Sequence, residues 1–432
     1  MPSDIVIVGA SAAGLSVAET LRRQGSDGRI TMIGAEDHLP YDRPPLSKEI
    51  LSGKWPDERV WLREAEAIAG LGIDLRLSTR ADSADADART VSLSDGTSVR
   101  YDELVIATGV RARRLRGTDG VPGVHVLRTL DDAKNLRAAL TGGPRLVIVG
   151  AGFVGAEVAS VARQLGADVT LISDIPAPLS DVLGRALGEL LMGLHAEHGV
   201  RIIAGTGVQE VIVKDGRAQG VRLADGREIE ADAVLVSIGS IPNVEWLAGS
   251  GIETGGPGTG GGVLCDQFCQ ARPGVWAAGD VASWHHPLLG ERLRIEHRTN
   301  AAEQGMAVAR NILAAASGSD LTPFTPVPYI WSDQYDLKVQ IYGLPRGTDR
   351  FTVTEGSTAD RKLVALYGKG GVVRAAVGIN MVRPVRTGRT LVAAAAPWDE
   401  AVPADTAVPA DTAVPASGAV PANDGIKEGI AS

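Results

Sequence analysis

The sequence predicts an α/β protein with two parallel-sheet units, followed by a smaller α+β module that has an antiparallel sheet. Three observations lead to this fold class. A short apolar strand that enters a glycine-rich loop and then a helix occurs twice, further apolar strands end in single glycines, and short alternating strands begin after about residue 321. The 432 residues, of which 44% are hydrophobic, suffice for two or three domains.

The first strand-loop-helix pattern comprises a strand at 4–8, the loop GASAAG at 9–14, a helix to residue 23 and a second strand at 29–33. Its first glycine allows a tight turn, its small middle residue lets the backbone approach a pyrophosphate, and its last glycine lets helix and strand pack closely. Phosphates would lie at the helix N-terminus. Glu36, just after the second strand, is placed to hydrogen-bond a ribose diol.

The second pattern has a strand at 145–149, the loop GAGFVG at 150–155, a helix to about residue 165 and a strand at 168–172. Together the two patterns predict two Rossmann-like dinucleotide-binding domains. Two such sites in one chain suggest a flavin and a nicotinamide, brought together for hydride transfer.

Other apolar strands also end in glycine loops. They are expected at 104–107, before Thr108-Gly109, at 233–238, before Gly239, and at 274–278, before Gly279-Asp280. An acid in the position of Asp280 can accept a hydrogen bond from a ribityl hydroxyl. The antiparallel strands are expected at 338–342, 350–354, 362–367 and 372–379.

The end of the sequence differs from the rest. From Ala401 it holds four imperfect copies of the hexapeptide AVPADT. Proline at every sixth position excludes a regular helix, and alanine and valine alone cannot bury enough surface to offset the entropy of ordering. We therefore expect a disordered tail at 397–432.

The composition argues against several classes of protein. The formal net charge of −9 argues against non-specific nucleic-acid binding. No apolar run reaches the ~18 residues of a membrane span, and no leader pattern precedes the first strand, so we expect a cytoplasmic protein. Cys265 and Cys269 are expected to be structural thiols, and His285 and His286 lack a third ligand nearby, so no metal site is expected.

Five segments carry a resemblance to a known family. They read YDRPPLSK at 41–48, YDELVIATG at 101–109, LRTLDD at 127–132, RIEH at 294–297 and WSDQY at 331–335. From about residue 4 to 395 the chain resembles the FAD-dependent, putidaredoxin reductase-like ferredoxin reductases that serve bacterial oxygenases and P450s. These belong to the pyridine nucleotide-disulfide oxidoreductase superfamily.

The resemblance implies a domain organisation and a set of site residues. The FAD domain would comprise 1–115 and 247–322, the NAD(P)H domain 116–246 and the C-terminal reductase domain 323–396. FAD contacts would come from Gly9, Ser11, Ala13, Gly14, Glu36, Arg43, Lys48, Ala81, Thr108, Gly109, Arg128, Gly279, Asp280 and Arg298. Nicotinamide dinucleotide contacts would come from Gly150, Gly152, Phe153, Val154, Gly155, Asp174 and Gly239.

Three residues are candidates for a catalytic role. The resemblance implies that Lys48 lies near the isoalloxazine, where a cation favours the anionic reduced flavin. Glu157 matches a family acid on the nicotinamide side, although an acid on the helix surface is the alternative. Arg298 stands where many relatives have tryptophan, and with Arg292 and Arg294 it forms a local cationic cluster. This cluster could receive an acidic ferredoxin, or it could be a solvated charged strand.

The predicted nicotinamide site departs from the family pattern. The family usually has glutamate at the end of the strand, whereas this chain has Ser173 followed by Asp174. The stretch 176–181 has no arginine, and Asp174 and Asp181 would repel a 2′-phosphate, so NADH is favoured over NADPH.

The resulting interpretation is a flavoprotein reductase that passes electrons from NADH through FAD to an acidic two-iron two-sulfur ferredoxin. It would act as a monomer or weak dimer. The segment at 41–48 has no cysteine, which disfavours a thiol relay. Two alternatives remain: an NADH oxidase, quinone reductase or flavin-dependent tailoring enzyme, and a redox-regulated NADH-binding interaction protein that resembles apoptosis-inducing factor.

Overall fold

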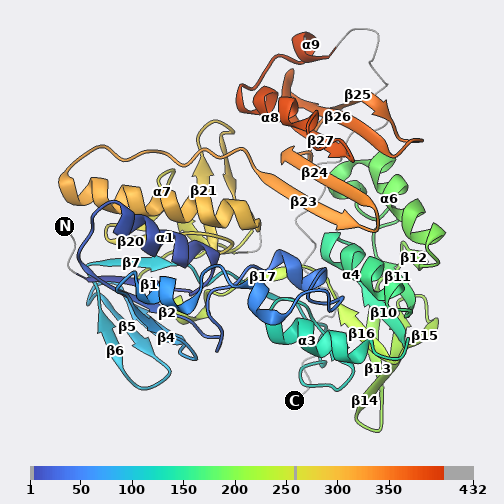
Figure 1. Cartoon of the computed structure of the whole chain (residues 1–432), viewed down its shortest axis with the longest axis horizontal. Coiled ribbons are helices and arrows are strands. Elements are labelled where there is room, and N and C mark those ends of the chain that lie inside the picture. The colour runs from blue at the N-terminus through green and yellow to red at the C-terminus, as the bar shows by residue number, and fades with distance from the viewer. Residues whose placement is uncertain (1–3, 257–259, 403–432) are drawn as a thin grey trace, which may run out of the picture.

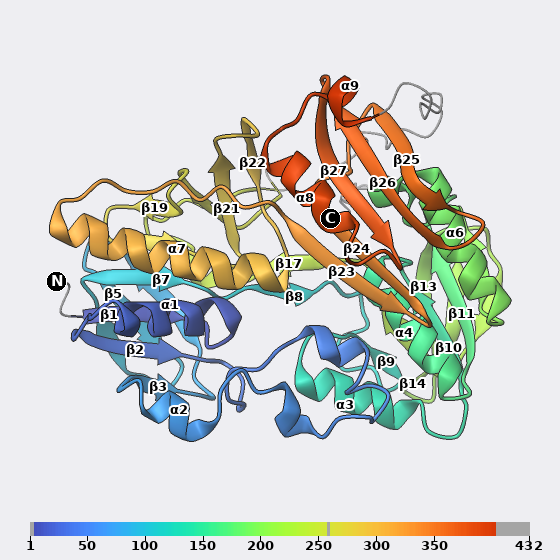
Figure 2. The ribbon, with the colours of Figure 1, turned by 45° about the horizontal axis from the view of Figure 1, so that its top comes forward.

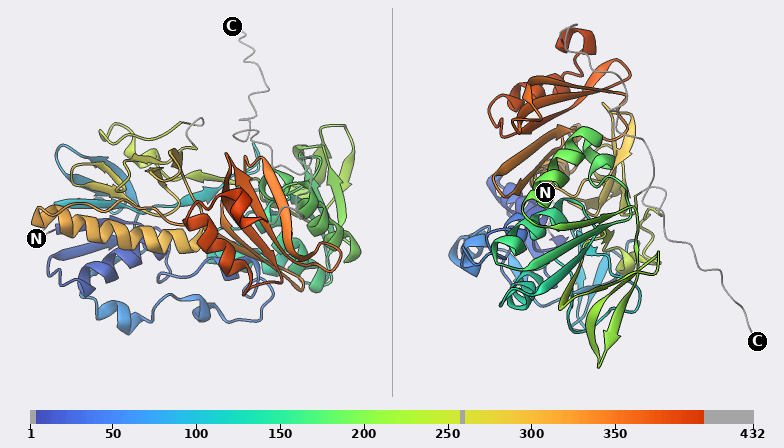
Figure 3. Two further views of the ribbon diagram at one scale, coloured as in Figure 1. Left: turned by 90° about the horizontal axis from the view of Figure 1, so that it is seen from above. Right: turned by 90° about the vertical axis from the view of Figure 1, so that its right-hand side faces the viewer.

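The computed structural model describes residues 4–256 and 260–402, and it confirms the predicted fold class (Figure 1). Two mainly parallel sheets lie in separate units, and an antiparallel sheet formed by the end of the described chain lies over the second unit (Figure 3). No helix among the described residues combines the length and the apolar character needed to cross a membrane.

The first sheet has the strand order β19-β20-β7-β1-β2-β3, and all neighbours except β19 and β20 pair in parallel. Its strands are β1 (Asp4–Val8), β2 (Arg29–Ile33), β3 (Asp74–Arg76), β7 (Glu103–Ile106), β19 (Gln270–Arg272) and β20 (Val275–Ala277). Helices α1 (Ala12–Arg23) and α7 (Arg298–Ser317) pack against each other beside this sheet (Figure 2). This packing places the start of α1 at the carboxyl ends of the strands, where ligands bind in such sheets.

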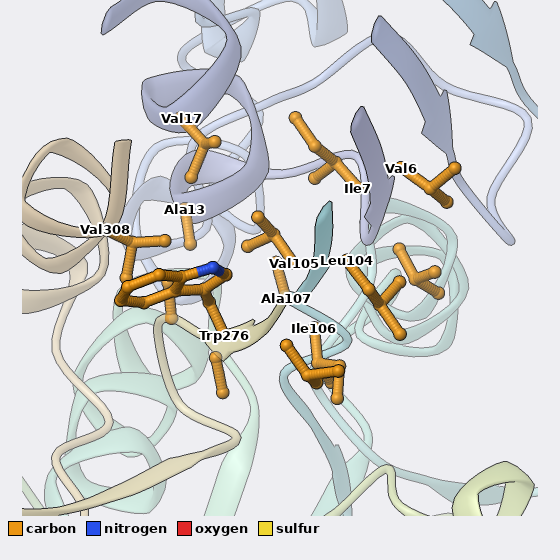
Figure 4. Packing of buried hydrophobic residues seen from close by; sticks show 14 of the residues in the cluster. Val6, Ile7, Ala13, Val17, Leu104, Val105, Ile106, Ala107, Trp276 and Val308 are labelled. Carbon is orange, nitrogen blue, oxygen red and sulfur yellow. The ribbon is translucent and has the colours of Figure 1, made fainter. Parts of the chain in front are cut away.

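The core of this unit lies between the sheet and the two helices. Trp276 of β20 is fully buried near Ala13 and Val17 of α1 and Val308 of α7 (Figure 4). Its indole nitrogen donates to the Glu103 carboxylate at 2.7 Å, so the one polar atom of the ring has a partner.

Short elements complete the first unit. They are β4 (Ala81–Asp85), β5 (Thr90–Leu93), β6 (Ser98–Arg100), β18 (Val263–Cys265), β21 (Ala282–His286), β22 (Glu291–Leu293), α2 (Ala65–Ala69) and the 3₁₀ turns η1 (Pro44–Ser47), η2 (Asp57–Val60) and η3 (Glu245–Leu247). His286 of β21 is buried, with Nε2 3.2 Å from the Pro326 carbonyl.

The second sheet has the order β12-β11-β10-β16-β9 and is parallel throughout. Its strands are β9 (Val124–His125), β10 (Arg145–Val149), β11 (Asp168–Ser173), β12 (Arg201–Ala204) and β16 (Ala233–Val236). Its helices are α3 (Leu130–Ala139), α4 (Phe153–Gln164), α5 (Ser180–Leu183) and α6 (Arg185–Glu197), and an antiparallel sheet is formed by β13 (Val208–Lys214), β14 (Arg217–Leu223) and β15 (Glu228–Glu230). The antiparallel pair β8 (Val110–Ala112) and β17 (Ser240–Pro242) connects this unit with the first.

The third sheet is antiparallel in the order β23-β24-β27-β26-β25. Its strands are β23 (Tyr329–Gln334), β24 (Leu337–Gly343), β25 (Arg350–Ser357), β26 (Lys362–Lys369) and β27 (Val372–Ile379), and its helices are α8 (Val385–Ala393) and α9 (Trp398–Ala401). β23 is not among the antiparallel strands expected from the sequence, the first of which begins at residue 338. Pairing with β24 makes this segment the edge strand that faces the other two units.

The packed C-terminal module extends past the expected boundary at residue 396. Trp398 and Val402 are both buried in its core. The Trp398 ring lies against Gly368, where a Cβ atom would be only 2.5 Å from the indole. The segment from 397 to 402 is therefore part of the fold rather than of the expected tail, and the rest of that tail lies outside the described residues.

Candidate functional site

A cavity of about 1150 Å³ lies where the three modules meet. The first unit contributes Gly9 and Glu36 to its wall, the second contributes Phe153 and Glu157, and the third contributes Trp331. The volume exceeds that of most pockets for drug-sized ligands, and it suits an extended ligand. The lining also includes the expected site residues Ala13, Ala81, Thr108, Gly109, Gly279 and Asp280.

The N-terminus of α1 opens into this cavity. Gly9 has a φ of +126°, and a Cβ there would lie 2.0 Å from the Ala107 carbonyl oxygen. A Cβ on Gly14 would lie 2.0 Å from the Gly9 carbonyl oxygen, so both positions require glycine. The N-cap residue Ser11 makes no capping hydrogen bond with its side chain, and the first turn holds no acid. The free N–H groups of this turn therefore suit a phosphate.

Glu36 is held at the end of β2 by two neighbours. Tyr41 donates its hydroxyl to Oε2 at 2.5 Å, and Arg43 Nη2 donates to Oε1 at 2.7 Å. Burial acts to raise the pKa of this carboxyl, but the charge of Arg43 and the two hydrogen bonds outweigh it, so the pKa lies below its ordinary value. Each oxygen keeps a lone pair for a ligand hydroxyl. Tyr41 was not predicted to hold Glu36, although this residue begins the segment YDRPPLSK at 41–48.

Asp280 forms a second acid–base pair on the cavity wall. Arg128 Nη2 lies 2.8 Å from its Oδ2, and Arg43 Nη1 donates to the Arg128 carbonyl at 2.8 Å. The preceding Gly279 donates its N–H to the Gln304 side chain at 2.9 Å. These contacts fix the loop after β20 and aim the Asp280 carboxylate into the cavity.

Lys48 and Glu157 form a third pair, which joins the modules. Lys48 Nζ lies 2.7 Å from Glu157 Oε2, and the Ser47 hydroxyl donates to the same oxygen at 2.5 Å. The Ser332 hydroxyl of β23 donates to Oε1 at 2.7 Å. Glu157 is only 5% exposed, so the alternative of an acid on the helix surface is wrong. Its carboxylate instead positions a buried cation on the cavity wall.

The expected cationic cluster is neutralised by its own surroundings. Arg298 lines the cavity, and its Nε lies 2.6 Å from Asp42 Oδ1. Arg294 lies 2.6 Å from Glu296, and Arg292 donates to the backbone carbonyls of residues 265 and 283. The three guanidinium groups therefore do not form a free positive patch, contrary to the expectation from their spacing.

The second glycine loop repeats the geometry of the first. A Cβ on Gly150 would lie 2.2 Å from the Ser237 carbonyl oxygen, and one on Gly155 would lie 2.2 Å from the Gly150 carbonyl oxygen. Gly152 caps α4 and faces open space. Phe153 and Val154 line the cavity beside this turn. The start of α4 is therefore open to a second dinucleotide next to the first.

The other residues expected around the nicotinamide dinucleotide lie outside the main cavity. Asp174 is exposed just after β11, whereas Ser173 is buried and its hydroxyl accepts the Ile175 N–H at 3.2 Å. Gly239 has a φ of +91° and an open neighbourhood. The third module brings Arg346 to this side, where it pairs with Asp181 at 2.7 Å. The sequence gives no sign of this arginine because the two residues lie far apart in the chain.

His297 also lies on the cavity wall, and its sequence context predicts no role for it. Its Nδ1 is buried and has no hydrogen-bond partner among the described residues. Burial lowers the pKa of His297 to about 4, so the ring is neutral near pH 7. A buried polar atom without a partner at the wall of a large cavity fits a ligand that supplies one.

The two thiols lie away from this chemistry. Cys265 and Cys269 are free and buried, and burial raises the pKa of Cys269 to about 12 and that of Cys265 above its usual range. Both thiols are therefore protonated and inert, as a structural role requires.

Comparisons with known proteins identify the family. Residues 3–305 match the family model described as pyridine nucleotide-disulphide oxidoreductase, and residues 329–414 match the reductase C-terminal model. The chain is 38% identical to the ferredoxin--NAD(+) reductase component of the anthranilate 1,2-dioxygenase system from Burkholderia cepacia, over 90% of this chain and 94% of that protein. It is 35% identical to rhodocoxin reductase from Rhodococcus erythropolis, over 91% and 90% of the two chains.

A solved structure supports the same assignment. The crystal structure of the covalent putidaredoxin reductase–putidaredoxin complex aligns with a TM-score of 0.86 and 33% identity, covering 93% of this chain and 97% of that chain. The cofactors of this family are FAD and NAD(H), and the geometry fits both. The close approach at Gly9, the open turns at the starts of α1 and α4 and the orphaned His297 nitrogen are what bound dinucleotides need. The chain is an oxidoreductase that belongs to the pyridine nucleotide-disulphide oxidoreductase family.

Proposed function

We propose that this chain is the reductase of an oxygenase or P450 system, which passes electrons from NADH through FAD to an acidic two-iron two-sulfur ferredoxin. The observation that carries this proposal is the shared cavity, into which the starts of both α1 and α4 open. When bound, FAD would accept two electrons from the nicotinamide and release them singly. The chain supplies binding, orientation and charge.

We assign the FAD site to the first unit. The turn at 9–14 would hold the diphosphate, Glu36 the adenosine ribose and Asp280 the ribityl chain. Arg43 and Arg128 orient these two acids and compensate their charge. Lys48, held by Glu157, would place a positive charge on the cavity wall where the reduced ring becomes negative.

We assign the NADH site to the turn at 150–155, with Asp174 beyond it. Asp174 would repel a 2′-phosphate, and the charge of Arg346 is already compensated by Asp181. This arrangement supports NADH rather than NADPH as the electron donor.

A basic surface for the ferredoxin is supplied by α8 rather than by Arg298. Arg383, Arg386 and Arg389 are exposed in or beside this helix and form no ion pair within residues 4–256 and 260–402. Arg386 and Arg389 lie close enough to Tyr342 to act on its hydroxyl electrostatically, and the Tyr342 ring stacks on Tyr329 at 4.7 Å. Tyr329 itself lines the cavity, so the stacked pair of Tyr329 and Tyr342 connects the cavity wall with the arginines of α8. Such a patch attracts an acidic partner.

The docking proposal can be tested with Arg389→Glu. At low salt, ferredoxin reduction should fall about three- to tenfold and the loss should fade as salt is added, because surface charges are screened. Ferricyanide reduction should not change. Arg100→Glu, at an exposed arginine of β6, is the matched control and should leave both rates unchanged. Equal losses with ferredoxin and ferricyanide would overturn the docking role of α8.

Turnover measurements on the wild-type chain also distinguish the proposed function from its alternatives. Rapid turnover with oxygen or a quinone, and none with ferredoxins, would favour the oxidase or tailoring enzyme. A long-lived complex with NADH that does not turn over would favour the interaction protein. We expect a cytoplasmic monomer or weak dimer, and sedimentation velocity tests the oligomeric state.

A further inference from the structure

A line of buried hydrogen bonds leads from Glu157 away from the cavity. The Ser332 hydroxyl contacts Glu157 Oε1 at 2.7 Å, and Gln334 Nε2 contacts Ser332 Oγ at 3.1 Å. His195 Nε2 lies 2.9 Å from Gln334 Oε1, and the Tyr335 hydroxyl lies 3.3 Å from His195 Nδ1. The three middle side chains are at most 1% exposed.

Three elements from two modules build this line. Glu157 lies on α4 and His195 on α6, and both helices belong to the second unit. Ser332 and Gln334 are alternate residues of β23, so they project from the same face of the strand. Figure 1 shows β23 beside α4 and α6.

The direction of every hydrogen bond follows from the charge at one end. Glu157 pairs with Lys48, so its carboxylate is an acceptor and Ser332 must donate its single proton to it. The Ser332 oxygen then accepts from the Gln334 amide nitrogen, which leaves the Gln334 oxygen facing His195. His195 must therefore carry its proton on Nε2, and its Nδ1 accepts from Tyr335.

We propose that His195 is a positioning residue, which in the Nε2–H tautomer holds the Gln334 amide and, through it, the orientation of the Ser332 hydroxyl that donates to Glu157. This proposal rests on the proposed function, because the Glu157 carboxylate in turn holds the Lys48 ammonium on the wall of the flavin site. Aligned hydrogen bonds in a dry interior strengthen one another, and a donor lost there leaves a buried group unpaired. The amide of Gln334 does not relay protons, so the line orients charge and does not conduct it.

The surroundings of His195 favour its neutral form. Burial lowers the pKa of His195 to about 4, although the hydrogen bond to Gln334 acts to raise it, and the nearby His198 acts in the same direction as burial. Nearby ionisable groups include Tyr335, which contacts the ring, Arg163 of α4, which donates to the His198 carbonyl, and Glu197 of α6, which pairs with Arg361. None of these groups forms an ion pair with His195 that would stabilise its protonated form.

The tautomer can be measured directly. In protein labelled with ¹⁵N-histidine, the His195 signals, assigned with His195→Gln, should show a protonated Nε2 and an unprotonated Nδ1. They should not titrate between about pH 5.5 and 8, given a pKa of about 4. A proton on Nδ1, or titration within that range, would overturn the proposal. This readout does not depend on the identity of the electron donor or acceptor.

Two substitutions separate positioning from packing. His195→Gln keeps an amide donor near the position of Nε2, whereas His195→Leu fills the space without one. We expect His195→Leu to lower the limiting rate of flavin reduction by NADH about tenfold, because the activation free energy would rise by about the contribution of one hydrogen bond. The Kd for NADH should not change. His195→Gln should stay within about twofold of the wild type, because it keeps that hydrogen bond. Equal losses in the two variants would contradict positioning.

A second variant covers the case in which His195→Leu does not fold. Gln334→Met has no donor at this position, so the Ser332 oxygen should lose the hydrogen bond that orients it and flavin reduction should slow as in His195→Leu. His285→Gln, at the exposed histidine of β21, is the matched control and should leave the rate unchanged. If the flavin of Gln334→Met is reduced as fast as that of the wild type, the line does not position Glu157. Failure of NADH to reduce the wild-type flavin would instead refute the proposed function.

Discussion

At the scale of single residues, the site is built from acid–base pairs that orient one another. Glu36 with Arg43, Asp280 with Arg128, and Glu157 with Lys48 all line one cavity and are only partly exposed. Removing one partner of a partly buried pair leaves the other charge uncompensated, which costs more than an exposed pair contributes. The three pairs therefore fix the geometry that a cofactor meets.

Glu36→Gln tests the first of these pairs. At pH 7 we expect the Kd for FAD to rise at least about tenfold, because a charged hydrogen bond to a ribose is worth about 1.5–3 kcal/mol. FAD fluorescence during reconstitution of the apoprotein measures it. Asp37→Asn, at the exposed neighbour, is the matched control and should bind FAD normally.

The same variant gives a pH signature. The pKa of Glu36 lies below the ordinary value of 4.5, so its contribution is present above about pH 4.5 and is lost as the pH falls through the lowered pKa. The FAD affinities of the wild type and Glu36→Gln should therefore converge at strongly acid pH. A difference that stays constant down to the lowest pH at which the protein folds would contradict this assignment.

At the scale of elements, the N-termini of α1 and α4 share one arrangement, a glycine-rich turn followed by an uncapped first helical turn. In both α1 and α4 a glycine before the helix approaches a neighbouring carbonyl too closely for any side chain, and no side chain caps the first turn. The positive end of each helix is thereby left for a phosphate.

Gly152→Glu tests this arrangement at α4. Gly152 has a φ of −74° and open space around it, so glutamate fits without backbone strain but places a negative charge where the NADH diphosphate would bind. We expect the Kd for NADH to rise more than about tenfold while FAD stays bound. Gly193→Glu, at another open glycine within helix α6, is the control. An unchanged Kd for NADH would place the second dinucleotide elsewhere.

At the scale of the whole molecule, buried neutral histidines link folding to pH. The pKa values of His195 and His297 are both lowered from 6.5 to about 4 by burial. Between those pH values the unfolded chain binds protons that the folded chain does not, so stability should fall as the pH drops from 6.5 towards 4, by on the order of 3 kcal/mol per histidine.

Thermal unfolding across this pH range measures the effect. The midpoint should fall steadily below pH 6.5, and His195→Gln should make the slope shallower because one of the groups with a lowered pKa is gone. A midpoint that is flat between pH 6.5 and 5 in the wild type would contradict the buried neutral state of these rings.

Features encoded in short stretches of sequence could be predicted, and long-range partners could not. The glycine loops and the strands β1, β2, β10 and β27 follow from local pattern, and the structure has them at the expected residues. The strand β23 was missed because tertiary pairing overrides its polar composition. The partners of Arg298, Glu157 and Asp181 come from distant segments, so neither the neutralised cationic cluster nor the buried state of Glu157 could be read from spacing.

The central claim is that NADH reduces a flavin held in this cavity, and anaerobic stopped-flow spectroscopy tests it most directly. The purified protein would be mixed separately with NADH and NADPH and followed at the visible band of the flavin. We predict rapid bleaching by NADH and slower bleaching by NADPH. Bound flavin that neither nucleotide bleaches would contradict the account, because the start of α4 would then not bring a nicotinamide to the flavin.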